Sequence, residues 1–207
     1  MVRIVLVRPG STDFDEQGRI KGTLDIPLSD HGACQVARIV EELHEQQFDQ
    51  VYSSPGRAAE QTAEAIAAER RLKVKRLDDL QNLDHGLWHG KLVDEVRYSQ
   101  PRVYRQLQEH PETVCPPEGE PVGEALERVR SVLGKVLKRH RTGSIALVVP
   151  EPLASLVRST LQHCDLGDLW KAECECGGWQ SIEVDARNGE SQIYRGAPLP
   201  LDYNHVG

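Results

Sequence analysis

The sequence lacks a long apolar run and any sign of an export signal. None of its apolar runs approaches the roughly 20 residues that a membrane-spanning helix needs. Met1 to Arg3 lead directly into an apolar segment of strand length, not into the apolar core of a signal peptide. We therefore expect a cytoplasmic protein that does not use a membrane as a partner.

Positive charge is not in excess either. Lys and Arg number 25 against 32 Asp and Glu, which gives a formal net charge of −7. The basic residues are scattered among acidic ones and form no basic stripe, which argues against nucleic acid as the main partner. The expected partner is a small molecule, phosphorylated or not, or a protein, with a homodimer as one form of the latter.

The cysteines are few, odd in number and irregularly spaced. This usage suits a reducing compartment better than a disulfide framework. His163, Cys164, Cys174 and Cys176 could in principle form a metal or redox site, but zinc sites usually use a wider Cys-x-x-Cys spacing. We expect no metal and no cofactor. The five cysteines are Cys34, Cys115, Cys164, Cys174 and Cys176.

The length of 207 residues suits a single domain. A chain of this size buries about 70% of its unfolded surface, so it needs neither a metal nor a disulfide to fold. We find no internal repeat and no low-complexity tract. The prediction is one domain over residues 1–207, with a core at about 2–195 and a proline-containing tail at 196–207.

Strand and helix patterns alternate along the chain. Ser29 is placed to cap the first long helix, and an Asn188-Gly189 turn predicts a terminal hairpin. Alternation of this kind is typical of a layered α/β fold. Strands are predicted at 4–7, 48–54, 72–77, 144–149, 178–186 and 191–195, and helices at about 30–43, 56–70, 93–98, 102–110, 121–140 and 153–163.

The first predicted strand ends in a turn that contains an arginine and a glycine, Arg8-Pro9-Gly10. The loop that follows, up to Leu28, resembles the signature of the histidine phosphatase (phosphoglycerate mutase-like) superfamily. In that family a strand ends in Arg-His-Gly-Glu-Thr and a GRxQGxxDxPL-like loop follows. The resemblance extends over about residues 2–195 and implies a three-layer α/β/α sandwich with a mostly parallel central sheet.

The resemblance also implies a phosphate pocket. In the family this pocket has two arginines, two histidines, one of which is phosphorylated, and an acidic proton donor. Here Arg8 keeps the first arginine, and Pro9 stands in place of the phosphorylated histidine. The second arginine falls on Ala58. Arg57 is one place away, and a one-residue shift rotates a helix by about 100°, so we expect it to point elsewhere.

Three more positions of the pocket differ from the family. The acid falls on Asn82, the second histidine on Glu151, and an asparagine after the first motif on Asp15. An asparagine cannot supply a proton as an acid does. Added carboxylates should disfavour a phosphate dianion. Because the resemblance places Arg8 and Glu151 in one pocket, we expect them to form an ion pair across the phosphate position.

These differences predict an inactive member of the family, a pseudophosphatase with a binding, scaffolding or regulatory role. No residue is assigned a catalytic role, and Arg8, His85 and Glu151 are the candidate ligand contacts. Two alternatives stay open. One is an active phosphomonoesterase or mutase that uses non-standard residues such as His85 or His89, and the other is a structural subunit that pairs with an active homologue.

Overall fold

A computed structural model describes residues 1–185 and 191–192 of the chain. Within them the central sheet has the strand order β3-β2-β4-β1-β5-β6. Strands β1 to β4 are all parallel to one another, while β5 runs antiparallel to β1 and to β6. The strands are β1 (Val2–Arg8), β2 (Gln50–Ser53), β3 (Val74–Arg76), β4 (Gly143–Val148), β5 (Gly178–Val184) and β6 (Ser191–Gln192).

The long helices fall where the sequence predicts them, within a few residues at each end. Two short helices, α1 and α8, were not predicted. Single 3₁₀ turns lie at Asp78–Leu80, Gly86–Trp88 and Pro111–Thr113. The helices are α1 (Asp13–Glu16), α2 (Asp30–Glu42), α3 (Arg57–Ala68), α4 (Val93–Ser99), α5 (Pro101–Glu109), α6 (Val122–Arg139), α7 (Leu153–Gln162) and α8 (Leu169–Glu173).

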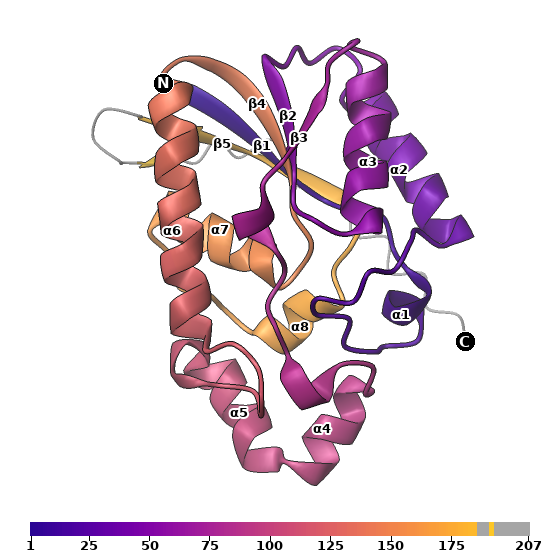
Figure 1. Ribbon diagram of the computed structural model, residues 1–207, viewed down its shortest axis with the longest axis vertical. Coiled ribbons are helices and arrows are strands. Elements are labelled where there is room, and N and C mark those ends of the chain that lie inside the picture. Colours follow the sequence, from indigo (N-terminus) through magenta and orange to yellow (C-terminus); the bar gives the residue numbers. More distant parts are fainter. Residues whose placement is uncertain (186–190, 193–207) are drawn as a thin grey trace.

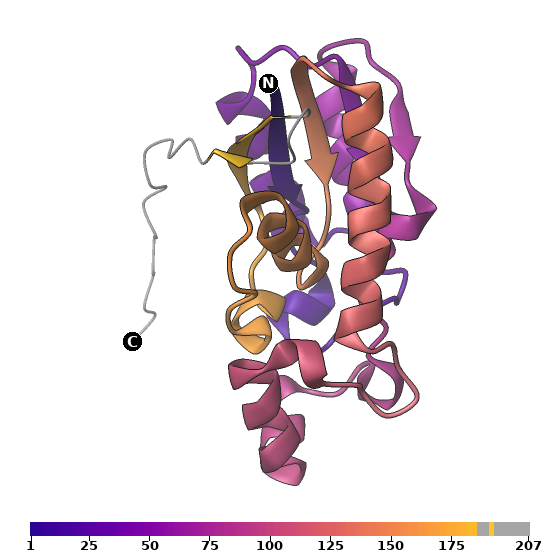
Figure 2. The ribbon, with the colours of Figure 1, turned by 90° about the vertical axis from the view of Figure 1, so that its left-hand side faces the viewer.

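Helices cover both faces of the sheet, as the alternation of side chains along a strand requires. In β1, Ile4 and Leu6 belong to a core that includes residues of α6 and α7. Val5 and Val7 belong to a second core with residues of α2 and α3. Figures 1 and 2 show these two helical layers on opposite sides of the sheet. The predicted α/β/α architecture is confirmed.

The turn after β1 lies directly on the first turn of α2. Ser29 caps this helix by accepting a hydrogen bond from the Gly32 N–H at 2.9 Å, as predicted. A Cβ atom at Gly10 would come within 2.3 Å of the Gly32 carbonyl oxygen, so the close approach requires glycine. The carboxyl end of β1 is therefore packed closely against α2.

The predicted terminal hairpin is present as the antiparallel pair β5 and β6, in which Val184 lies opposite Ser191. Its predicted turn, at 186–190, and the predicted tail at 196–207 lie outside the described residues. Among the helices of the described chain, none combines the length and the apolar character that crossing a membrane requires.

Candidate functional site

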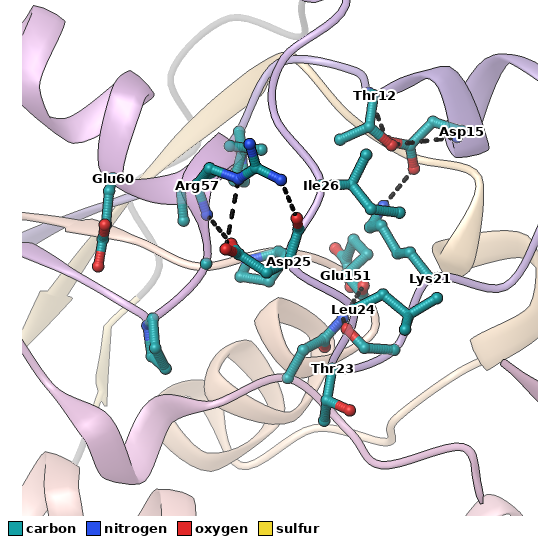
Figure 3. A pocket seen from close by; sticks show the side chains of 18 of the residues that line it. Thr12, Asp15, Lys21, Thr23, Leu24, Asp25, Ile26, Arg57, Glu60 and Glu151 are labelled. Carbon is teal, nitrogen blue, oxygen red and sulfur yellow. Dashed lines mark hydrogen bonds and ion pairs between the residues drawn. The ribbon is translucent and has the colours of Figure 1, made fainter. Parts of the chain in front are cut away.

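A cavity of about 330 Å³ opens at the carboxyl ends of the parallel strands. Its walls come from the turn after β1, the loop up to Ile26, the start of α3, the turn after β4, and the segment after α8. Figure 3 shows its labelled side chains, with Glu151 in the middle of the view. All seven predicted pocket positions meet here: Pro9, Asp15, Arg57, Ala58, Asn82 and Glu151 line the cavity, and Arg8 contacts Glu151.

The guanidinium group of Arg8 lies between two carboxylates. Its Nη1 atom is 3.8 Å from Oε1 of Glu151, so the expected ion pair is present. The same nitrogen forms a closer hydrogen-bonded ion pair with Glu175, which was not predicted. The side chain of Glu151 is 5% exposed and that of Glu175 is 43% exposed. One cation therefore serves two carboxylates in very different environments.

Glu151 is the buried carboxyl group of the cavity. Burial raises the pKa of this group, and this effect outweighs the opposing influence of Arg8 and of the hydrogen bonds from Ser155. The backbone N–H of Ser155 donates to Oε2 of Glu151 at 3.0 Å. One carboxyl oxygen is thus fixed by the helix, while the other faces Arg8.

A second ion pair lies on another wall of the cavity. Lys21 pairs with Asp15, which also accepts hydrogen bonds from the backbone N–H and the hydroxyl of Thr12. Burial alone would lower the pKa of Lys21, but the carboxylates of Asp15 and Glu173 reverse the effect and raise it. The lysine therefore stays charged and neutralises Asp15, the carboxylate that the sequence analysis left unpaired.

The expectation that Arg57 points away from the pocket is wrong. Arg57 lines the cavity and is held there by Asp25, which accepts from its backbone N–H at 2.8 Å and lies 3.3 Å from its Nε. The rotation argument fails because the whole first turn of α3 borders the cavity, so both Arg57 and Ala58 line it despite their different directions from the helix axis. Figure 3 shows the Arg57–Asp25 pair. Ala58 contributes only a methyl group to the wall.

Asn82 joins two walls of the cavity. Its amide donates to the carbonyls of Gly22 at 3.1 Å and Glu151 at 3.0 Å, and its oxygen accepts from the Leu153 N–H at 3.4 Å. All of these bonds are buried. The residue at the position of the family's acid is therefore a structural connection between the loop and the turn after β4.

The two candidate histidines are not among the residues that line the cavity. His85 is 2% exposed, and its Nε2 is 3.2 Å from a carboxylate oxygen of Glu173, so the proposed ligand contact by His85 is not supported. His89 accepts from the backbone N–H of Thr23 at 3.3 Å, and burial lowers the pKa of its ring. Among the described residues, no group of three His, Cys, Asp or Glu is arranged to hold a metal ion.

Sequence reasoning did not place Lys21, Glu175 or Cys176 at this site. Lys21 had a signal, because it lies six positions from Asp15 in the same loop. Glu175 lies 167 positions from Arg8, and the sequence carries no signal for that contact. Burial raises the pKa of the Cys176 thiol, so it stays protonated and is a weak nucleophile.

Fold and site together define an α/β protein with an arginine-containing pocket at the strand ends. A model of the histidine phosphatase superfamily (branch 1) matches residues 4–195, and the chain belongs to this family. Phosphoserine phosphatase 1 of Hydrogenobacter thermophilus is 32% identical over 187 residues, which cover 90% of this chain and 89% of that protein.

Two solved structures share the fold. A mycobacterial glucosyl-3-phosphoglycerate phosphatase is similar with a TM-score of 0.78 and 22% identity, over 92% of this chain and 96% of its own. A variant of phosphoserine phosphatase from Entamoeba histolytica, in complex with phosphoserine, has a TM-score of 0.77 and 21% identity, over 93% of this chain and 95% of that protein. At this identity the likeness concerns the fold alone.

The expectation of an inactive family member is contradicted by these comparisons. The relative that is 32% identical along nine tenths of this chain is named a phosphatase. The correction has a physical basis as well. Sequence reasoning added the charges of Asp15 and Glu151 to the pocket without their partners, whereas Lys21 neutralises the first and burial favours the protonated form of the second.

Proposed function

We propose that the protein is a phosphomonoesterase, which hydrolyses a phosphate ester to an alcohol and inorganic phosphate. The observation that carries this proposal is the 32% identity to a protein named phosphoserine phosphatase over 90% of this chain. The cavity beside Arg8 supports it, because a guanidinium group at a strand end is suited to a phosphoryl group.

The reaction must proceed without a phosphorylated residue at position 9. Proline has no nucleophilic side-chain atom, and the position that the family resemblance gives to the second histidine carries Glu151. Water is then the nucleophile. Phosphoryl transfer passes through a loose transition state, so binding of the phosphoryl oxygens and protonation of the leaving group contribute more than the strength of the nucleophile.

Glu151 has the environment of a general acid. A buried carboxyl with a raised pKa holds its proton to a higher pH than an exposed one, and from the protonated form it can donate to the leaving alkoxide. The oxygen of water bonds to phosphorus, the ester P–O bond breaks, and the alkoxide takes the proton of Glu151. The product phosphate, which retains both protons of the water, returns one to Glu151. Arg8 binds the phosphoryl oxygens throughout.

The test compares a substrate with a poor leaving group and one with a good leaving group. The pure protein should release phosphate from O-phosphoserine and from para-nitrophenyl phosphate, and Arg8→Ala should abolish both reactions. Glu151→Gln should lower kcat for O-phosphoserine by about 10²-fold or more. It should affect the nitrophenyl ester much less, because nitrophenolate leaves without a proton.

The pH dependence gives a second readout. In the wild type, kcat for O-phosphoserine should fall as pH rises through the raised pKa of Glu151, and this limb should disappear in Glu151→Gln. The exposed Glu127, paired with Arg130 on α6, provides the matched control Glu127→Gln, which should behave as the wild type. No phosphate release from either ester, or release that survives Arg8→Ala, would reject the proposal.

A further inference from the structure

Cations on the wall of the cavity are each paired with a carboxylate of the chain. Lys21 pairs with Asp15, Arg57 with Asp25, and Arg76 with Glu60 at 2.9 Å. Arg76 also pairs with Asp78, which does not line the cavity, so each of these three cations has one carboxylate partner on the cavity wall. At Arg8, by contrast, two carboxyl groups of the cavity wall, Glu151 and Glu175, share one guanidinium group. With Glu151 protonated, as the proposed mechanism requires, Glu175 is the counter-ion of Arg8.

Of the two carboxyl groups at Arg8, that of Glu175 is the one that can move away from the guanidinium group. Its side chain is 43% exposed, whereas that of Glu151 is 5% exposed and is held by Ser155. The backbone next to Glu175 is fixed, since the Gly177 N–H donates to the Pro9 carbonyl at 2.7 Å. Rotation of the Glu175 side chain would free Arg8 while the segment stays in place. The carboxylate would remain at the cavity, whose wall includes Glu175.

We propose that Glu175 determines substrate specificity: a phosphate group displaces its carboxylate from Arg8, and the displaced carboxylate then pairs with an ammonium group in the alcohol part of the substrate. This inference rests on the proposed function and names its substrate class. The substrates are small phosphate monoesters that carry a primary amine.

Electrostatics explains why the amine is needed. Once phosphate binds Arg8, the Glu175 carboxylate has lost its counter-ion and lies near a second anion. Like charges a few ångströms apart repel strongly in a partly desolvated cavity. An ammonium group on the ligand removes this repulsion, whereas a neutral alcohol leaves it. A cavity of about 330 Å³ has room for a small amino-alcohol phosphate.

The experiment measures binding with two phosphonates that cannot be hydrolysed. 3-Aminopropylphosphonate and butylphosphonate have the same chain length and differ only in a terminal ammonium or methyl group. Isothermal titration calorimetry with the wild type should show about tenfold tighter binding of the amine, the effect of one added charged hydrogen bond. Inorganic phosphate serves as a third ligand without an alcohol part.

The variant Glu175→Gln should remove this preference. It should bind butylphosphonate and inorganic phosphate several-fold more tightly than the wild type, because no carboxylate of residue 175 competes for Arg8. Glu127→Gln is the matched control and should bind all three ligands as the wild type does. Because Glu175 is partly exposed, the variant should fold normally, which circular dichroism checks.

Two results would overturn the inference. One is equal binding of the two phosphonates by the wild type, and the other is a preference for the amine that persists in Glu175→Gln. These outcomes are separable from the failure of the proposed function, since binding of phosphonates requires no turnover. Amine preference without hydrolysis of any ester would reject the phosphatase and keep the ligand class. Hydrolysis without amine preference would reject only the role of Glu175.

Discussion

Two walls of the cavity, the one that contains Lys21 and the one beside Arg8, balance their charges in different ways. At Lys21, one cation meets one carboxylate, and the two side chains are only 10% and 4% exposed. At Arg8, one cation meets two carboxylates, one buried and one partly exposed. The first arrangement is closed and electrically matched. The second is open, and its two carboxyl groups share one cation.

The difference separates charges that hold the structure from charges that are free to act. A buried, matched ion pair is expensive to break, because each group would be left without a counter-ion away from water. A carboxylate that shares its cation with another one can instead take up a proton or exchange its partner. Variants on the two walls should therefore have different consequences for stability, which the following predictions order by size.

Lys21→Met should have the largest effect. It leaves the carboxylate of Asp15 buried without its counter-ion, which should lower the free energy of unfolding by about 3–5 kcal/mol in urea titrations. The double variant Asp15→Asn with Lys21→Met removes both charges and should recover much of the loss, as a double-mutant cycle can measure. If the single variant lowered the free energy of unfolding by less than about 1 kcal/mol, the Lys21–Asp15 ion pair would not be what stabilises this wall.

Asn82→Ala should come next, because Asn82 connects the two walls. Its loss leaves the buried carbonyls of Gly22 and Glu151 without their donor, at a cost of about 1–3 kcal/mol in the free energy of unfolding. Thermal unfolding followed by circular dichroism gives the measurement. Gln81→Ala, at the exposed neighbouring position, is the control, and an equal loss in the two variants would contradict the role of Asn82.

Glu151→Gln should change the pH dependence of stability. The pKa of Glu151 is raised above its ordinary value of 4.5, so its contribution to stability is complete below that pH and is lost as pH rises through the raised value. The variant has no such loss. Its stability relative to the wild type should therefore increase from about pH 4 to pH 8, by about 1.4 kcal/mol for each unit of pKa shift. A constant difference across this range would show that Glu151 does not titrate in this way.

Glu175→Gln should have the smallest effect on stability. Its carboxylate is 43% exposed, and Arg8 keeps Glu151 as a partner, so the free energy of unfolding should change by less than about 0.5 kcal/mol. Urea titrations of Glu175→Gln and Lys21→Met, carried out in parallel, compare how much the charges on the two walls contribute to the free energy of unfolding. A loss of more than about 2 kcal/mol would place Glu175 among the structural charges instead.

The sequence was a good guide to the fold because the fold depends on local patterns. The apolar run of β1, the Ser29 cap and the periodicity of α6 are each contained in a few consecutive residues. Helix α8 was missed because five residues are too few for a period to appear, although Asp168 caps it. Its position matters, since the chain that leaves α8 carries Glu175 to Arg8.

The site was predictable in its positions and not in its charge balance. Family resemblance located Arg8 and Glu151, and the structure brings them within 3.8 Å. The state of each charge depends on partners and burial that only the folded chain defines. Lys21 beside Asp15 and the raised pKa of Glu151 are of this kind, and leaving them out led to the wrong expectation of an inactive protein.

The hydrogen bond from the Gly177 N–H to the Pro9 carbonyl uses no side chain of either segment. Because this hydrogen bond joins main-chain atoms alone, it requires no particular side chain at residue 9. This makes position 9 a convenient point for enzyme engineering. Pro9→His would place an imidazole at this position and show how much rate a covalent route adds to the proposed hydrolysis by water.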